Sequence, residues 1–346
     1  MEGECELRAG PGAEPMSSTP PWWDDAWRYL QRRRESGRLP HAVLLAGPQG
    51  IGKGAFAEEW ARALLCETPV AGGRACGRCR ACRLSAAGTH PDRFRLDPVE
   101  GRAIPIDAVR ALCGFLTLSG NYGGWRVALI VGAERMTIAA ANALLKTLEE
   151  PGARTMLLLV SDRAGMLPAT VRSRCQRIVF PLPPRAAALA WLNANAGGEE
   201  VDGALARAGG APFAALEWIR SGAEDPRPEL VRELAAVAGG RTDPAAAAQR
   251  CAARGAGETL RWLSSCVMDM VRLRCSSQPA VLRHPDLREP LQRLAAACPP
   301  QRLFRYLDRL GAGEREAAGS MNDQLLLEDV FIEWRELSAP LRRGRG

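Results

Sequence analysis

A glycine-rich loop near the start of the chain carries residue types that bind phosphate. Residues 47–54 read Gly-Pro-Gln-Gly-Ile-Gly-Lys-Gly and fit the pattern G-x-x-x-x-G-K. In such a loop backbone N–H groups surround phosphate oxygens and the lysine reaches the β- and γ-phosphates. The candidate nucleotide-binding residues are Gly47, Gly50, Gly52 and Lys53. The next position should supply a Ser or Thr hydroxyl for Mg²⁺, but Gly54 has no side chain.

Lysine is rare in this chain. Of 46 Lys and Arg residues only Lys53 and Lys146 are lysines. A compact ammonium and a planar guanidinium are not interchangeable where geometry matters, so the lysine in the loop favours a retained phosphate contact. A purely structural turn is the competing interpretation, and both stay open from the sequence.

The second requirement of ATP hydrolysis is a carboxylate after a core strand, where it holds Mg²⁺. The apolar run Val127–Val131 is followed instead by Gly132 and Ala133. Glu134 comes later, and we expect it to open the following loop. With two metal-handling positions empty, the sequence predicts that ATP is not hydrolysed.

Four cysteines have the spacing of metal ligands. The candidate ligands are Cys66, Cys76, Cys79 and Cys82, in the pattern C-x9-C-x2-C-x2-C. Tetrahedral Zn²⁺ binds four thiolates, and C-x2-C turns bring pairs of them together. An iron–sulfur site or a group of reduced thiols remains an alternative. The other seven cysteines are interpreted as small core residues.

A further candidate is Arg174, in the tripeptide Ser173-Arg174-Cys175. An isolated arginine is usually a solvated surface residue. This one lies between the third and fourth predicted strands, at the edge of a nucleotide-binding fold. There it could instead reach the γ-phosphate held by a neighbouring subunit.

Short apolar runs and helical periodicities alternate through the first half of the chain, which predicts a doubly wound α/β domain ending near residue 184. The predicted strands are 41–46, 125–131, 155–160 and 178–180, and the predicted helices are 22–38, 55–65, 106–118 and 137–149. Residues 1–20 are expected to be disordered, 185–220 to form a small helical unit and 221–228 to be a linker. Everything after 229 is predicted helical, with breaks at 239–244, 276–290 and 311–320.

The composition is that of a soluble protein, with 47% hydrophobic and 25% charged residues. The net charge of +7 is compatible with nucleic acid nearby but does not require it. No apolar stretch is long enough for a membrane span, and the start of the chain does not resemble a secretion signal. We therefore expect a cytoplasmic protein, in which clustered cysteines indicate metal.

Two longer segments carry a resemblance to a known family. Residues 142–151 read NALLKTLEEP and residues 167–175 read LPATVRSRC. With the cysteine module placed between the glycine-rich loop and the second core strand, they resemble the AAA+ clamp-loader subunits of bacterial DNA polymerase III. The resemblance extends from about Trp22 to Trp334.

This resemblance implies a fold and an assembly. The expected architecture is a RecA-like AAA+ α/β domain over 21–184 with an inserted zinc module at 66–82, a small helical lid at 185–222 and an all-α collar at 223–346. The implied partners are the gamma/tau and delta subunits and, through the hetero-oligomeric complex, the sliding clamp and primed DNA during DNA replication.

Departures from the pattern of the motor subunits imply a specialised role. The lid segment has Pro212 where a motor carries a sensor arginine. Together with Gly54 and Gly132, this change implies a non-hydrolytic stator that offers Arg174 as an arginine finger in trans, with structural Zn²⁺ and with ATP or ADP binding left open. The alternatives are a short gamma/tau-type ATPase and a zinc-dependent nucleic-acid-binding module.

Overall fold

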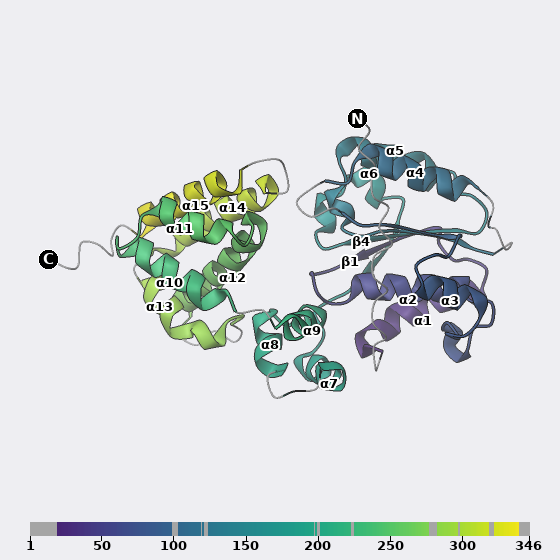
Figure 1. Cartoon of the computed structure of the whole chain (residues 1–346), viewed down its shortest axis with the longest axis horizontal. Coiled ribbons are helices and arrows are strands. Elements are labelled where there is room, and N and C mark those ends of the chain that lie inside the picture. Colours follow the sequence, from purple (N-terminus) through teal and green to yellow (C-terminus); the bar gives the residue numbers. More distant parts are fainter. Residues whose placement is uncertain are drawn as a thin grey trace. The chain divides into compact units, whose positions relative to one another are not determined.

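The computed structural model describes two compact units (Figure 1). The described residues are 19–98, 103–118, 120, 124–196, 198, 201–222, 225–276, 282–296, 298–317 and 322–338. The first unit comprises Met1–Leu205 with Gly210–Arg220, and the second comprises Ala206–Gly209 with Ser221–Gly346. Residues 1–18 of the segment predicted to be disordered lie outside the described residues.

The core of the first unit is a five-stranded parallel sheet with the strand order β2-β3-β4-β1-β5. The strands are β1 (Ala42–Ala46), β2 (Arg93–Leu96), β3 (Arg126–Ile130), β4 (Thr155–Ser161) and β5 (Gln176–Val179). Every residue of β1, β3 and β4 is buried, because helices cover both faces of the sheet. This burial explains why the three strands are continuous apolar runs in the sequence.

The edge strand β2 was not among the predicted strands, and the prediction of only four strands is wrong. Its sequence, Arg-Phe-Arg-Leu, contains no apolar run and is mostly half-buried. Arg93 and Arg95 both form ion pairs with the buried carboxylate of Glu58, at 2.5 and 2.6 Å. Only Phe94 and Leu96 are apolar in this four-residue strand, which is too short a pattern to predict a strand from the sequence.

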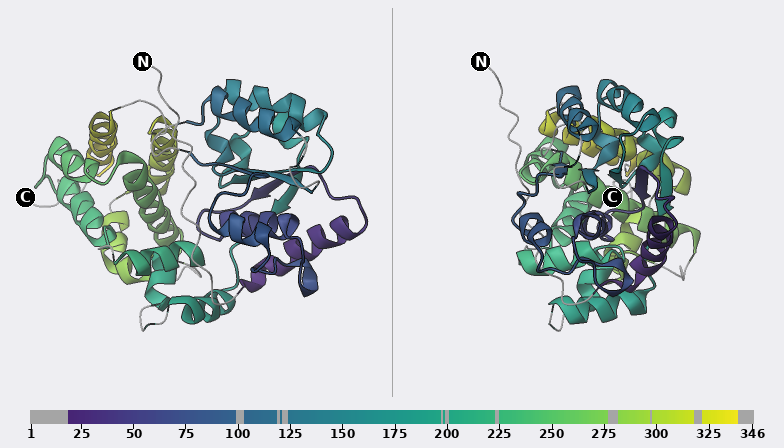
Figure 2. Two further views of the ribbon diagram at one scale, coloured as in Figure 1. Left: turned by 45° about the vertical axis from the view of Figure 1, so that its right-hand side comes forward. Right: turned by 90° about the vertical axis from the view of Figure 1, so that its right-hand side faces the viewer.

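Helices cover the two faces of this sheet as separate layers (Figures 1 and 2). One layer consists of α1 (Asp24–Glu35), α2 (Lys53–Leu65) and α3 (Arg80–Ala86). The other consists of α4 (Ile106–Thr117), α5 (Ile138–Glu149) and α6 (Ala169–Arg172). The four helices predicted in this part of the sequence match α1, α2, α4 and α5 within a few residues.

Three further helices follow the sheet, namely α7 (Arg185–Ala196), α8 (Val201–Arg207) and α9 (Pro212–Ser221). Aromatic rings connect them to the start of the α/β domain. The Phe213 ring stacks on Trp191 and on Trp23, with centroid separations of 4.6 and 5.7 Å. Trp22 meets Trp191 edge-on. Most of this helical segment therefore belongs to the first compact unit.

The second unit is built from helices packed around one apolar core. They are α10 (Arg227–Ala238), α11 (Pro244–Ala252), α12 (Ala256–Cys275), α13 (Arg288–Ala296), α14 (Pro300–Glu316) and α15 (Asp323–Leu337). The break predicted at 311–320 begins later than expected, because α14 continues to Glu316. A glycine suits position 313 of this helix because the helix packs closely on α12 there. A Cβ at Gly313 would lie only 3.3 Å from the Leu260 side chain.

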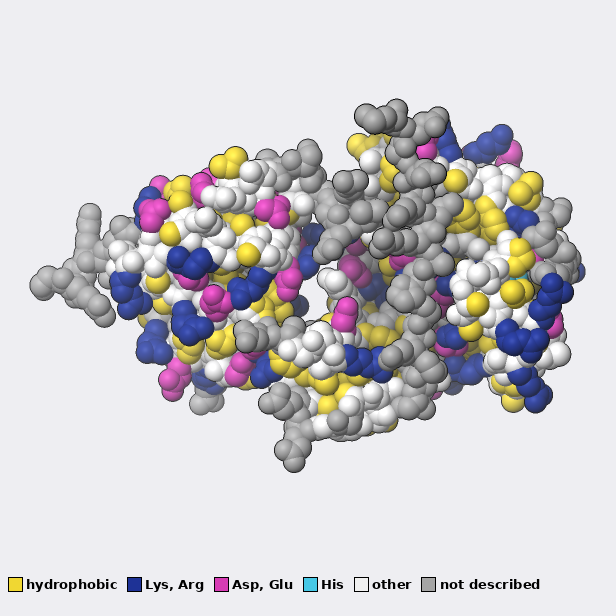
Figure 3. Space-filling view, in the orientation of Figure 1, with side chains coloured by type: hydrophobic (Ala, Val, Ile, Leu, Met, Phe, Trp, Pro, Cys, Tyr) yellow, Lys and Arg dark blue, Asp and Glu magenta, His cyan; other side chains and the backbone are white. Residues whose placement is uncertain are grey.

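Charges of both signs are interspersed on the face of the second unit that Figure 3 presents. Elsewhere in this unit, Arg250 of α11 and Arg254, just after the end of α11, pair with Glu233 and Glu229 of α10, at 2.7 and 2.5 Å. In these pairs each arginine charge is matched by a carboxylate. In the described part of the chain, no helix has the length and apolar character to cross a bilayer.

Candidate nucleotide loop, metal centre and arginine finger

The glycine-rich loop lies between a buried strand and a helix, as the sequence predicts. β1 ends at Ala46 and α2 begins at Lys53. Gly50 and Gly52 have φ values of 74° and 90°, a region that suits glycine because it has no Cβ. At Gly47 a Cβ would lie 2.2 Å from the Phe180 carbonyl oxygen. The loop therefore needs its glycines for backbone shape and for close packing.

The ammonium group of Lys53 is already engaged within the chain. Its Nζ donates to the Pro48 carbonyl oxygen at 2.6 Å and to Asp162 Oδ1 at 2.7 Å. The Lys53 side chain is 2% exposed, whereas that of Asp162 is 36% exposed. A nucleotide phosphate would have to compete with the Asp162 carboxylate for this lysine.

The helical segment at α9 packs directly on the loop. The Gly50 carbonyl oxygen accepts hydrogen bonds from the backbone N–H groups of Phe213 and Ala214, at 2.8 and 3.1 Å. A Cβ on Gly52 would lie 2.3 Å from the Phe213 ring. Pro212 is the first residue of α9. An apolar ring and a helix start therefore lie against the glycine-rich loop.

The two positions at which the sequence predicts missing Mg²⁺ ligands are both glycines in the structure. Gly54 has no side chain and therefore supplies no hydroxyl, although a Cβ there would project into open space. Gly132 follows β3 with a φ of 61° and offers no carboxylate. Glu134 lies in the short 3-10 helix that follows, but its Oε1 accepts the backbone N–H of Asp162 at 3.2 Å. Glu134 therefore holds the backbone of Asp162 through this hydrogen bond, in addition to opening the loop as predicted.

Sequence reasoning missed the roles of Asp162 and Phe213. Asp162 directly follows β4, which pairs with β1 in the sheet. The carboxyl ends of neighbouring parallel strands form the ligand-binding edge of such sheets, so an acidic residue at that position was a usable signal. Phe213 gave no comparable signal, because its contact with Gly52 depends on tertiary packing.

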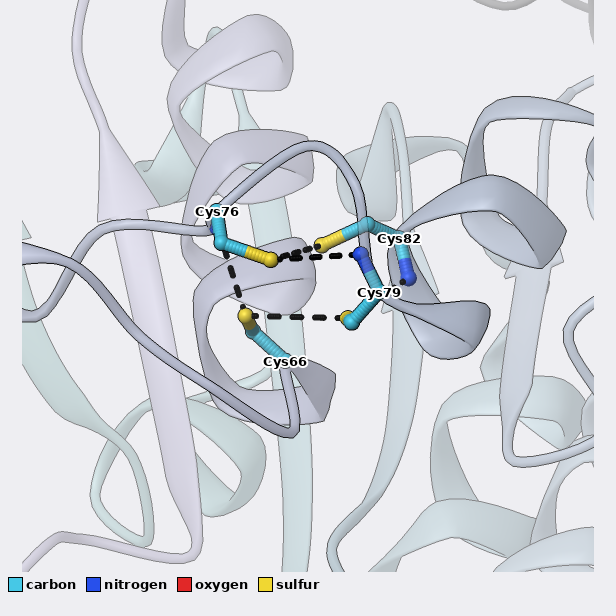
Figure 4. A group of neighbouring side chains, drawn as sticks. All are labelled: Cys66, Cys76, Cys79 and Cys82. Carbon is cyan, nitrogen blue, oxygen red and sulfur yellow. Dashed lines mark hydrogen bonds between the residues drawn. The ribbon is translucent and has the colours of Figure 1, made fainter.

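The four candidate metal ligands converge at the end of α2 and the start of α3 (Figure 4). Cys66 follows the last residue of α2, Cys79 caps the N-terminus of α3 and Cys82 lies within α3. Their Sγ atoms all lie within 4.8 Å of one another. The Cys66–Cys79 and Cys76–Cys82 sulfur pairs are separated by 3.9 and 4.0 Å.

Backbone N–H groups point at these sulfurs. The N–H groups of Cys76, Cys79 and Cys82 donate to the Sγ atoms of Cys66, Cys76 and Cys79, at 3.3, 3.3 and 3.4 Å. The Thr68 hydroxyl, together with backbone N–H groups, lowers the pKa of Cys76 to about 5. Burial raises the pKa of Cys82 to about 12. A bound cation would overcome that desolvation, because metal-bound cysteine is a thiolate.

The donor set fits zinc. A tetrahedral Zn²⁺ with Zn–S bonds of about 2.3 Å requires sulfurs roughly 3.8 Å apart, close to the two separations above. A disulfide would need about 2.05 Å, and all four cysteines are free. Within the described residues, this ligand group contains no histidine or carboxylate. Four thiolates suit a closed, structural zinc site.

Arg174 lies between α6 and β5 and is partly exposed. Its Nε donates to Glu149 Oε1 at 2.8 Å, and its Nη2 lies 2.6 Å from the same oxygen. Its Nη1 donates to the Thr170 carbonyl oxygen at 3.0 Å. Among the bonds that the structure describes, none joins Arg174 to the chain's own glycine-rich loop.

Comparison with known proteins decides the family. Residues 23–184 match the family described as DNA polymerase III, delta subunit, and residues 223–336 match its C-terminal family. The DNA polymerase III subunit delta' of Pseudomonas aeruginosa is 35% identical over 331 residues, covering 94% of this chain and 100% of that protein. The chain belongs to the delta' family of DNA polymerase III subunits. The expected resemblance is thereby confirmed.

Other relatives agree with the delta' assignment. The Escherichia coli subunit delta' is 32% identical, with 90% of this chain and 94% of that protein covered. The Bacillus subtilis subunit tau is 32% identical over 154 residues, which cover 44% of this chain and 27% of tau. The similarity to delta' proteins therefore extends over both units, whereas the similarity to tau covers less than half of the chain.

Proposed function

We propose that this delta' family member is a non-hydrolytic subunit of the DNA polymerase III clamp loader. It supplies Arg174 in trans to ATP bound by a neighbouring subunit. The gamma/tau and delta subunits are its direct partners, and the sliding clamp and primed DNA are met through the assembled complex. ATP held by the neighbours then drives clamp loading during replication.

The observation that carries the proposal is the Lys53–Asp162 ion pair. Phosphoryl transfer depends on a lysine that neutralises the β- and γ-phosphates and on side chains that hold Mg²⁺. Here the lysine is paired with a carboxylate at 2.7 Å, and Gly54 and Gly132 stand at the metal positions. The engaged lysine and the two missing Mg²⁺ ligands would each lower the rate of ATP hydrolysis strongly. Together they support a subunit that does not hydrolyse ATP.

Arg174 is the group that this subunit offers to chemistry elsewhere. Its side chain is 36% exposed, which makes it accessible to a neighbouring chain. A guanidinium from a neighbour neutralises charge that develops on the transferred phosphoryl group. The planar fork matches phosphate oxygens better than an ammonium does.

The thiolate cluster serves the fold. Zn²⁺ bound by Cys66, Cys76, Cys79 and Cys82 would join the end of α2 to the start of α3. The free energy of binding such a metal stabilises the folded state. We assign it no step in ATP chemistry.

A short gamma/tau-type ATPase is the main alternative, and the partial similarity to tau keeps it worth testing. The experiment compares ATP turnover by the isolated chain with turnover by the loader assembled with and without it. Our proposal predicts background turnover for the isolated chain at high Mg²⁺ and a higher rate for the complete assembly. Turnover by the isolated chain at the rate of a motor subunit would contradict it.

A further inference from the structure

The carboxylate of Glu149 holds one edge of the Arg174 guanidinium. Both Nε and Nη2 of Arg174 point to the same oxygen, Glu149 Oε1, at 2.8 and 2.6 Å. On the other side, Nη1 donates to the Thr170 carbonyl oxygen at 3.0 Å. The Ser173 hydroxyl is 3.5 Å from Nη1, which is too long for a good hydrogen bond. Arg174 is therefore fixed from two directions.

This arrangement leaves a defined part of the guanidinium available. An arginine has five N–H donors in a planar fork. Glu149 takes the Nε–H and one Nη2–H, and Thr170 takes one Nη1–H. One N–H remains on each of the two terminal nitrogens. Those two donors are available to oxygens of a phosphoryl group.

The position of Glu149 is unfavourable for its own helix. It is the last residue of α5 and is followed by Glu150, although the C-terminus of a helix favours cations and disfavours anions. Local rules are broken most often where a residue serves a site. The Arg174 charge compensates the Glu149 carboxylate, whereas the neighbouring Glu150 has no such partner among the bonds described for this segment.

We infer that Glu149 is a positioning residue for the arginine finger. It fixes the orientation of Arg174 so that the two free N–H groups face outward, toward the phosphate that a neighbouring subunit brings. This inference rests on the proposed role of Arg174 in trans. An opposite role, in which Glu149 sequesters Arg174 from the neighbour, would make its removal increase the rate.

The test uses the assembled loader with its clamp and primed DNA. Glu149→Ala should lower the stimulated ATPase rate, by about fivefold at most at the affected interface, because partly exposed ion pairs contribute modestly. Glu149→Gln, which keeps an acceptor oxygen, should recover part of the loss. Glu150→Gln removes the same charge from the same helix end without touching Arg174, and should retain the wild-type rate.

Two further measurements separate positioning from stability. Adding Glu149→Ala to Arg174→Ala should cause no additional loss of rate, since the glutamate acts only through the arginine. The thermal midpoint of the Glu149 variants should change little, because the loss of a partly exposed ion pair and the removal of an anion from a helix C-terminus offset each other. In the isolated chain, ¹⁵N spectra should show faster water exchange of the Arg174 Nε–H in Glu149→Ala.

The outcomes distinguish the arginine-finger role of Arg174 from the positioning role of Glu149. An unchanged rate for Arg174→Ala would remove the arginine-finger role itself. A reduced rate for Arg174→Ala, with a wild-type or increased rate for Glu149→Ala, would overturn only the positioning role. Additive losses in the double variant would also overturn it.

Discussion

The Lys53 Nζ and Asp162 Oδ1 atoms lie 2.7 Å apart, with the Lys53 side chain almost fully buried. This pair occupies the one cation of the glycine-rich loop with a carboxylate from the end of β4. The charge of the loop is thus neutralised by a side chain of the same protein. The pair also links two segments that are 109 residues apart in the sequence.

Replacing Asp162 with Asn should destabilise the fold. The buried Lys53 ammonium would lose its counter-charge, and breaking a buried pair is costly. Because Asp162 is 36% exposed, the free energy of unfolding should fall by less than it would for a fully buried pair. We expect a loss of about 1–3 kcal/mol. Urea denaturation measures it. The control is Asp202→Asn, whose partner Arg185 forms an exposed pair, and an equal effect in both variants would contradict the special role of Lys53.

Gly54→Ser should leave the chain inactive in ATP hydrolysis. A serine fits, because a Cβ at this position meets no atom within 4 Å. Within α2 it should raise stability by about 0.5 kcal/mol, since glycine is a poor helix former. The hydroxyl alone cannot hold Mg²⁺ while Gly132 lacks a carboxylate and Lys53 remains paired. A coupled ATPase assay that detects turnover in this single variant would refute that account of the loop.

Cys79→Ser should remove both metal and stability. We expect about one Zn²⁺ per chain in the wild-type protein, measured by elemental analysis, and a lower thermal midpoint in the variant, because metal binding is coupled to folding. Cys275 is exposed and outside the cluster, so Cys275→Ser should keep both properties. A metal-free wild-type protein, or a visible iron chromophore, would argue against zinc.

Phe213→Ala should loosen the segment that covers the loop. The ring contacts Gly52 and stacks on Trp23 and Trp191, and it is partly buried. Replacing a fully buried Phe with Ala lowers the free energy of unfolding by about 3–5 kcal/mol. Because Phe213 is only partly buried, we expect roughly half of that loss. Hydrogen exchange at the Phe213 and Ala214 amides should increase. Phe304→Ala, at a 51% exposed ring, is the matched control and should change stability little.

The sequence was most informative where local pattern decides structure. The strands β1, β3 and β4 are apolar runs, and the four-cysteine spacing by itself predicts the convergence that the structure has. The edge strand β2 was missed because it is four residues long and two of them are arginines, which pair with Glu58 on a helix more than 30 residues earlier.

Contacts between distant segments could not be predicted in the same way. Lys53 was identified from its motif, but its pairing with Asp162 depends on the order of strands in the sheet. Arg174 was singled out by its place before the last predicted strand and by the family resemblance, whereas the Glu149 carboxylate beside it lies 25 residues away in the sequence. The chemistry of single residues could be predicted from the sequence. Which residues pair with one another could be seen only in the folded structure.

We propose above all that Arg174 acts on ATP held by a neighbouring subunit. The decisive measurement is the ATPase rate, stimulated by clamp and primed DNA, of the loader assembled with Arg174→Ala. A finger contributes about 10³–10⁵ in rate at its own site, so we expect a partial loss for the whole ring and a larger loss of clamp loading, with assembly intact. Arg174→Lys should rescue poorly, and Arg172→Ala is the neighbouring control. A wild-type rate in a correctly assembled ring containing Arg174→Ala would contradict the claim.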